Sequence, residues 1–179
     1  IFGDGKEGFI DQPQKAEANA AFTDIILDSR GSMLLCIDEN KRVGGWGNAG
    51  YGYLGAGIEE YRDEFQYAQN LSGITSVSIG GSHVLALDED HCVWEWGVST
   101  HSQLSSKEWL VEFPTKIDGL YDIVSIAAGP CCSIYVKSDG TIWGRGYGIP
   151  QQGYLEELTL IDIFDDVAEI IPAENGDFF

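Results

Sequence analysis

The chain has 179 residues, of which 44% are hydrophobic and 12% aromatic, a composition that supports a packed core and excludes a disordered protein. No apolar run reaches the roughly 18 residues of a membrane-spanning helix, so we expect no membrane association. The formal net charge of −19 would repel phosphate backbones, which argues against direct nucleic-acid binding. It fits either a solvated acidic surface that aids solubility or a basic partner.

The alternation of apolar runs and turn residues predicts a series of short strands. Residues 1–22 read as the end of one structural unit, followed by a polar, alanine-rich connector. A first complete unit follows in residues 23–73. Its predicted strands are 25–27, 32–37, 43–46 and one within 65–71, with a glycine-rich loop at 47–55 and an acidic excursion at 59–64.

The second unit, residues 74–121, shows the same order most clearly. It has an apolar entry, a glycine pair, an apolar run, an acidic turn and a second apolar run that ends in Trp96-Gly97, with a fourth strand expected at 113–117. The third unit, residues 122–164, repeats this order, and its last strand is expected at 158–163. Residues 165–179 open a further unit.

These units are copies of one repeat. Gly47, Gly97 and Gly146 recur at intervals of 50 and 49 residues (97 − 47 and 146 − 97), and the shift of 49 also places Leu85 on Ile134 and Trp94 on Trp143. A β-solenoid would have shorter repeats of roughly 20–30 residues, and a sandwich would not repeat at this interval.

The second predicted strand of each repeat shows why the sheets must stack. In the second unit His83, Leu85 and Leu87 would lie on one face of the strand, whereas Val84 and Ala86 would lie on the other. Because both faces are apolar, neither can face water. Repeated four-stranded antiparallel sheets that are buried on both sides predict an all-β protein of the β-propeller class.

The repeat resembles the RCC1 family, the repeats of the regulator of chromosome condensation. The family pattern is an apolar residue, two small residues and Gly, then two residues of any kind, His and an apolar run. An acidic turn, Trp-Gly and a loop ending in Gly-Gln-Leu-Gly follow. The segments that carry the resemblance are Val77-Ser78-Ile79-Gly80-Gly81-Ser82-His83, Ile126-Ala127-Ala128-Gly129 and Trp46-Gly47-Asn48 with Gly52-Tyr53-Leu54-Gly55.

The chain also departs from this pattern. Arg30 stands at the Gly position of the first repeat, Met33 and Cys132 stand where His is expected, and Arg145 replaces the Trp of the third repeat. Such loose repeats favour a bacterial member. The resemblance covers nearly the whole chain and implies a β-propeller, which in this family usually has seven blades.

We therefore predict a single RCC1-like β-propeller domain, or part of one, over residues 1–179. It would contain three complete four-stranded blades, at approximately 23–73, 74–121 and 122–164, and a split or partial blade from residues 1–22 and 165–179. Three arrangements fit: a piece of a longer protein, a homodimer in which two copies complete a ring, or a four-bladed ring. In the four-bladed ring Ile1-Phe2-Gly3 would complete the blade opened by residues 166–179.

The resemblance implies a non-enzymatic scaffold that recognises another protein through the loops on the faces of the propeller. It also implies alternatives: guanine-nucleotide exchange on a small GTPase, or inhibition of an enzyme as in bacterial secreted members. A further alternative is a sugar-binding or hydrolytic propeller with a site in its central channel. The inner positions Met33, His83, Cys132 and Gly176 differ in chemistry and do not converge on one reaction.

Two aromatic residues are the candidate binding residues. Trp109 lies in the loop 105–112 and has no counterpart in the other repeats, and Tyr61 occupies a similar insertion in the first repeat. Aromatic side chains on loops often anchor interfaces. A local lid over the edge of the blade is the alternative role.

Other motifs have simpler explanations. The loop Gly50–Gly55 fits G-x-G-x-x-G but lacks a following helix, so we expect no nucleotide cofactor. The acidic turns lack the oxygen spacing of a calcium site, so we expect no metal. His83 is expected to bond a backbone group at the inner turn. The four cysteines lack zinc-site spacing and are expected to be free thiols, with Cys36 in the core, which weakly favours a reducing compartment.

Overall fold

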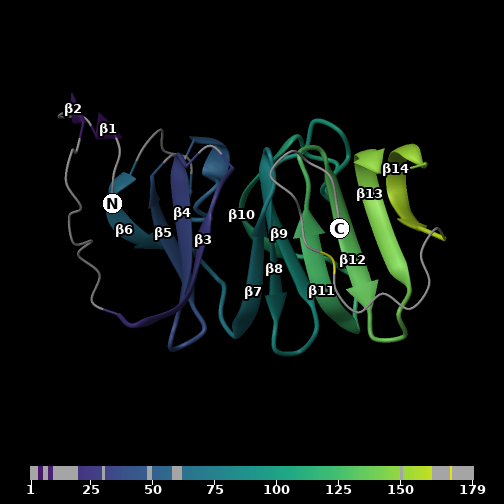
Figure 1. The fold of residues 1–179 in the computed structure, drawn as a ribbon, viewed down its shortest axis with the longest axis horizontal. Coiled ribbons are helices and arrows are strands. Elements are labelled where there is room, and N and C mark those ends of the chain that lie inside the picture. The colour runs from purple at the N-terminus through teal and green to yellow at the C-terminus, as the bar shows by residue number, and fades with distance from the viewer. Residues whose placement is uncertain are drawn as a thin grey trace.

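The computed structural model describes residues 4–5, 8–9, 20–29, 31–47, 50–57, 62–149, 151–162 and 170. Most of these residues form three four-stranded antiparallel sheets that stand side by side (Figure 1). Within each sheet, strands that are consecutive in sequence are neighbours in space. The sheets are the three predicted blades, so the all-β prediction and the repeat of one supersecondary unit are both confirmed.

The strands of the blades are as follows. Blade 1 consists of β3 (Phe22–Leu27), β4 (Met33–Asp38), β5 (Val43–Gly47) and β6 (Arg62–Tyr67). Blade 2 consists of β7 (Ile74–Ile79), β8 (His83–Asp88), β9 (Val93–Val98) and β10 (Leu110–Lys116). Blade 3 consists of β11 (Ile123–Ala128), β12 (Cys132–Lys137), β13 (Ile142–Ile149) and β14 (Gly153–Leu160). A separate two-stranded pair joins β1 (Asp4–Gly5) and β2 (Gly8–Phe9), and a short 3-10 turn, η1, spans Gly50–Gly52.

The predicted fourth strand of every blade overlaps the observed strand but starts too late. These strands begin at residues 62, 110 and 153, which is three, three and five residues before the predicted starts at 65, 113 and 158. They lie at the outer edge of each sheet, where polar side chains face water, and most side chains of β14 are exposed or half-buried. An apolar pattern therefore does not mark where they begin.

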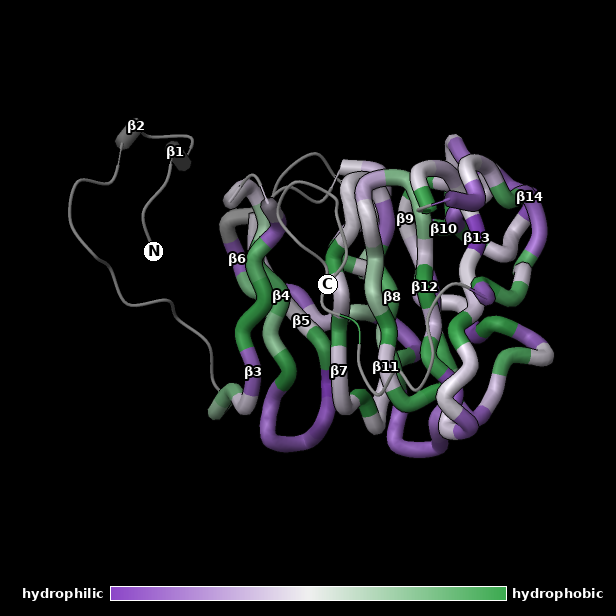
Figure 2. The backbone as a smooth tube through the Cα atoms, turned by 45° about the vertical axis from the view of Figure 1, so that its right-hand side comes forward, coloured by the Kyte–Doolittle hydropathy of each residue, from purple (hydrophilic) through white to green (hydrophobic). Residues whose placement is uncertain are grey.

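The cores lie between the blades. All six residues of β8 are buried, as the apolar sequence on both faces predicted. Val84 and Ala86 pack with Leu35 in the cluster between blades 1 and 2, whereas Leu85 packs with Tyr135 in the cluster between blades 2 and 3. Figure 2 shows the central strands as largely hydrophobic and the turns between the second and third strands as hydrophilic.

The recurrent glycine after the third strand has a steric cause. Gly47, Gly97 and Gly146 have φ values of 102°, 104° and 100°, and the pairing of the third and fourth strands shifts register close to each of them. A Cβ atom on Gly146 would lie 2.3 Å from the carbonyl oxygen of Cys131. Both the positive φ and the close backbone contact therefore require glycine.

Parts of the predicted split blade lie outside the described residues. This holds for residues 1–3 and for 166–179 except Ile170, which is buried in the third apolar cluster. The inner position Gly176 also lies outside them. No helix in the described part of the chain is long and apolar enough to cross a membrane.

Candidate protein-binding face

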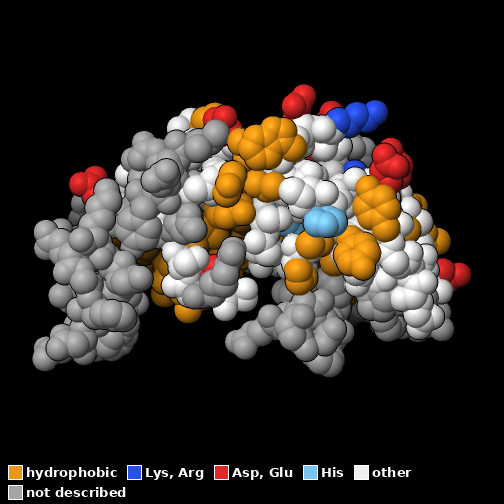
Figure 3. All heavy atoms as spheres, turned by 90° about the horizontal axis from the view of Figure 1, so that it is seen from above, with side chains coloured by type: hydrophobic (Ala, Val, Ile, Leu, Met, Phe, Trp, Pro, Cys, Tyr) orange, Lys and Arg blue, Asp and Glu red, His pale blue; other side chains and the backbone are white. Residues whose placement is uncertain are grey.

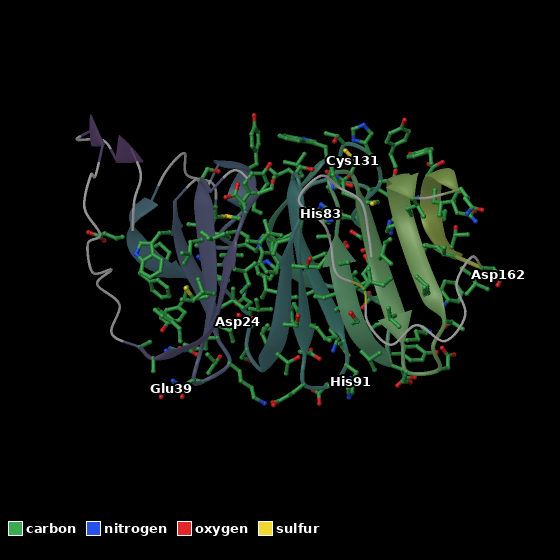
Figure 4. The ribbon with its side chains drawn as sticks, viewed as in Figure 1. Asp24, Glu39, His83, His91, Cys131 and Asp162 are labelled. Carbon is green, nitrogen blue, oxygen red and sulfur yellow. The ribbon has the colours of Figure 1, made fainter. Side chains whose placement is uncertain are left out.

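The two ends of the blades differ in the length and composition of their connections. Short acidic hairpins join the second and third strands at one end, where Glu39 and His91 lie (Figure 4). The connections between the third and fourth strands lie at the opposite end, together with the turn that contains Cys131. In blades 1 and 2 these connections, between β5 and β6 and between β9 and β10, are longer than the hairpins. We call the first the hairpin end and the second the loop face.

Trp109 lies on the loop face, and the structure brings it against a residue of the neighbouring blade. Its ring stands 6.4 Å from that of Tyr51, at an interplanar angle of 75°. The two side chains remain 59% and 55% exposed. Figure 3 shows hydrophobic side chains gathered on this face, with acidic side chains around them. We call these two residues the Tyr51–Trp109 pair. The other predicted binding residue, Tyr61, lies outside the described residues.

The aromatic surface continues over blades 2 and 3. The ring of His101 lies 6.0 Å from that of Tyr147, and the hydroxyl groups of Ser102 and Tyr154 are hydrogen-bonded at 2.8 Å. Both tyrosines are more than half exposed. The sequence analysis missed these residues and Tyr51. The repeat alignment held one signal, because a shift of 50 places Tyr51 on His101, so equivalent loops carry rings at equivalent positions.

Buried polar side chains hold the loop of Trp109 from beneath. Glu95, which is only 1% exposed, accepts hydrogen bonds from the backbone N–H groups of Ser105 at 2.7 Å and Ser106 at 3.3 Å, and from the Ser105 hydroxyl. Nε of Arg145 donates to the carbonyl oxygen of Ser102 at 2.7 Å. The side chain of Gln103 is fully buried and donates to the carbonyl oxygen of Val98 at 2.9 Å. These bonds fix the loop before any partner binds.

Glu95 is another residue that the sequence analysis missed, and a signal for it was present. The equivalent residues in blades 1 and 3 are Gly45 and Gly144, so blade 2 alone has a carboxylate at this buried position. Burial raises the pKa of Glu95, and the hydrogen bonds from Ser105 and the nearby charge of Arg145 oppose that shift. Oε1 of the carboxylate therefore holds the loop, whereas Oε2 has no hydrogen-bond partner among the described residues.

Replacement of Glu95 by alanine is expected to loosen this loop. The amides of Ser105 and Ser106 would lose their acceptor, so their hydrogen exchange should become at least roughly tenfold faster, the equivalent of about 1.4 kcal/mol. Hydrogen exchange measured by NMR checks this expectation. Glu108→Ala, on the exposed part of the same loop, is the control and should leave the exchange of both amides unchanged. Equal exchange in Glu95→Ala and the parent protein would show that Glu95 does not hold the loop.

His83 is a structural residue whose partner differs from the predicted one. Its Nε2 lies 2.8 Å from the side-chain hydroxyl oxygen of Ser133 in blade 3, whereas the prediction was a bond to a backbone group at the inner turn. The Ser133 hydroxyl donates to the carbonyl oxygen of Gln103 at 2.7 Å. Nε2 of His83 must therefore carry the proton and donate to Ser133. Ser133 is thus not arranged as a nucleophile with His83 as its base.

Complete burial lowers the pKa of His83 to about 3, so the ring is neutral at ordinary pH. Its Nδ1 is one of three buried polar atoms without a partner in the described part of the chain, with Glu95 Oε2 and Tyr135 Oη. Burial likewise raises the pKa of the Tyr135 hydroxyl. All three side chains belong to the packing between blades 2 and 3.

No described feature resembles a small-molecule site. A small hollow lies between blades 1 and 2, is lined by Met33, Tyr53 and His83 among others, and has a volume of about 10 Å³, room for about one water molecule. Within the described ranges, no three His, Cys, Asp or Glu side chains gather as metal ligands. The four cysteines are free thiols, as predicted, and Cys36 is buried.

Curated proteins show similar sequences, although no family model matches the chain. The mitochondrial RCC1 domain-containing protein RUG3 of Arabidopsis thaliana is 34% identical over 122 residues, which cover 65% of this chain and 27% of RUG3. The regulator of chromosome condensation of Xenopus laevis is 32% identical over 101 residues, 53% of this chain and 24% of that protein. Human E3 ubiquitin-protein ligase HERC2 is 27% identical over 128 residues, 68% of this chain and 3% of HERC2. The chain thus spans about a quarter or less of the length of these relatives.

Solved structures of yeast RCC1 (Prp20) share the fold. The structure bound to Kap60 superposes with a TM-score of 0.74 at 20% identity and covers 99% of this chain and 50% of Prp20. A second structure, of Prp20p from Saccharomyces cerevisiae, superposes with a TM-score of 0.71 at 19% identity and covers 94% of this chain and 48% of that one. Together with the repeats and the three stacked sheets, these similarities lead to one conclusion: the chain belongs to the RCC1-repeat family and forms blades of an RCC1-type β-propeller.

Proposed function

We propose that this chain is a non-enzymatic scaffold that binds another protein through its loop face, centred on the Tyr51–Trp109 pair. The observation that carries the proposal is the exposure of both rings, 55% and 59%, although they come from different blades and contact each other. Exposed aromatic side chains on a rigid loop are typical anchors of protein interfaces. The buried bonds of Glu95 and Gln103 supply that rigidity to the loop of Trp109.

The charge supports a basic partner, and the structural relatives support a protein partner. The net charge of −19 favours association with a positively charged surface. The titles of the Prp20 structures describe that protein bound to Kap60 and binding to Gsp1p and histones. Guanine-nucleotide exchange is the second candidate, since a propeller that binds Gsp1p superposes on nearly the whole chain. A bacterial source remains a prediction.

We also propose that this chain is one part of a larger propeller. The outer face of blade 1 is apolar: Ile25 and Leu27 are 59% and 62% exposed, and the rings of Phe22, Trp46 and Phe65 pack together on that blade. Another blade would cover such a surface, and the chain spans half of Prp20. Two copies in a homodimer are the alternative source of that blade.

Binding is expected to depend on the loop face alone. Peptides selected from a random displayed library on the parent protein should bind Trp109→Ala and Tyr51→Ala at least roughly tenfold more weakly, the loss typical of a truncated aromatic anchor. Tyr121→Ala is the matched control, because Tyr121 is also 59% exposed but lies toward the hairpin end, beneath Lys137. Biolayer interferometry measures these affinities. Equal affinities of the peptides for all three variants would contradict the proposal.

A further inference from the structure

Toward the hairpin end, positively charged side chains of the chain itself lie over aromatic rings. The guanidinium carbon of Arg42 lies 4.1 Å from the centroid of Tyr67. Nζ of Lys137 lies 5.0 Å from the ring of Tyr121 and 5.5 Å from that of Trp143, and Nζ of Lys116 lies 6.0 Å from the ring of Trp94. These contacts pair the π-faces of half-exposed rings with positive charge.

The Tyr51–Trp109 pair has no such cation among the described residues. Trp109 has a ring contact with Tyr51 alone, and Tyr51 has ring contacts with Trp109 and Tyr53 alone. At an interplanar angle of 75° the two rings stand nearly perpendicular, so a flat group on the free face of one ring can reach the other. The pair thus presents ring faces on the loop face that no described cation covers, whereas the ring faces toward the hairpin end are covered by cations.

Two acidic residues, Glu108 and Glu112, lie close to the pair in the chain or in space. Glu108 precedes Trp109 and is exposed, although Lys107 beside it offsets part of its charge. The backbone of Glu112 lies against Gly52, since a Cβ on Gly52 would stand 2.9 Å from the carbonyl oxygen of Glu112, and this places an acidic residue next to Tyr51. The net charge of −19 adds a favourable long-range field.

We infer that the Tyr51–Trp109 pair binds one arginine side chain of the partner's segment, with the guanidinium group stacked against the two rings. Arginine fits better than lysine, because the guanidinium group is planar, weakly hydrated and stacks on aromatic faces. The inference rests on the proposed function, since it names the chemistry that the same face recognises.

The test uses the selected peptides as synthetic copies in which one arginine at a time is replaced by citrulline, its neutral isostere, or by lysine. One citrulline position should lower the affinity for the parent protein roughly 3- to 30-fold, and lysine at that position should cost less. The Tyr51→Leu variant should bind the arginine peptide and the citrulline peptide with equal affinity. The Tyr51→Phe variant, which keeps the ring, should still bind the arginine peptide more tightly than the citrulline peptide.

The possible failures of the two proposals are distinguishable. Peptides that depend on Trp109 but contain no arginine, or that tolerate citrulline at every position, would overturn the arginine inference and leave the binding face in place. If citrulline lowers the affinity for the Tyr51→Leu variant as much as for the parent protein, the arginine does not bind to this pair. Peptides that bind the parent protein and Trp109→Ala equally would overturn the proposed binding face itself.

Discussion

Replacement of Trp96 by alanine is expected to lower the free energy of unfolding by about 3–5 kcal/mol. Trp96 is fully buried in the apolar cluster between blades 1 and 2, and its indole N–H donates to the carbonyl oxygen of Tyr53 at 2.8 Å. The variant would open a cavity in this cluster and remove the hydrogen bond from Trp96 to the carbonyl oxygen of Tyr53. Denaturant unfolding followed by circular dichroism measures the change.

Trp109→Ala is the matched control for this experiment. It removes the same side chain, but Trp109 is 59% exposed, so its stability should change by less than about 0.5 kcal/mol. The two substitutions should therefore separate stability from binding: Trp96→Ala unfolds the protein more easily, and Trp109→Ala weakens peptide binding. Equal stability losses would contradict the packing of the blades described above.

Acid is expected to destabilise the protein through His83. The pKa of His83 is near 6.5 in the unfolded chain and about 3 in the folded protein. Between these two pH values His83 binds a proton in the unfolded chain but not in the folded protein. The stability contributed by the neutral ring is therefore complete above about pH 6.5 and is lost as the pH falls. The loss is about 2 kcal/mol between about pH 7 and about pH 5, and about 4–5 kcal/mol by about pH 3.

His83→Gln isolates this contribution, because glutamine can donate to Ser133 but does not titrate. The difference in unfolding free energy between His83→Gln and the parent protein should change by about 2 kcal/mol in favour of the variant on acidification from about pH 7 to about pH 5. Glu95 has a raised pKa and acts in the opposite direction, but its effect cancels in the comparison. If the variant does not fold, the ring resonances of His83 provide the test. Their titration above about pH 5 in the folded protein would contradict the account.

The sequence predicted the inner part of each blade well. Strands β4, β8 and β12 could be located because they pack on both faces, and this requirement leaves a continuous apolar run. The starts of the outer strands β6, β10 and β14 were predicted too late because water covers one of their sides. The segments 1–3 and 166–179 stay untested predictions.

The candidate face could be predicted only in part. Trp109 stands out because it breaks the repeat, but its neighbour Tyr51 is 58 residues away (109 − 51) and lies in a different blade. Such a contact depends on how the blades stack and on the backbone of Tyr51, which has a φ of 61°. The role of Glu95 likewise depends on the loop that folds over it.

Hydrogen exchange of the protein with and without a selected peptide tests the central claim most directly. The account predicts that the peptide protects amides of residues 50–57 and 99–110, on the loop face, and leaves the hairpins around Glu39, His91 and Asp139 unchanged. Protection confined to those hairpins, or to the outer face of blade 1, would contradict it.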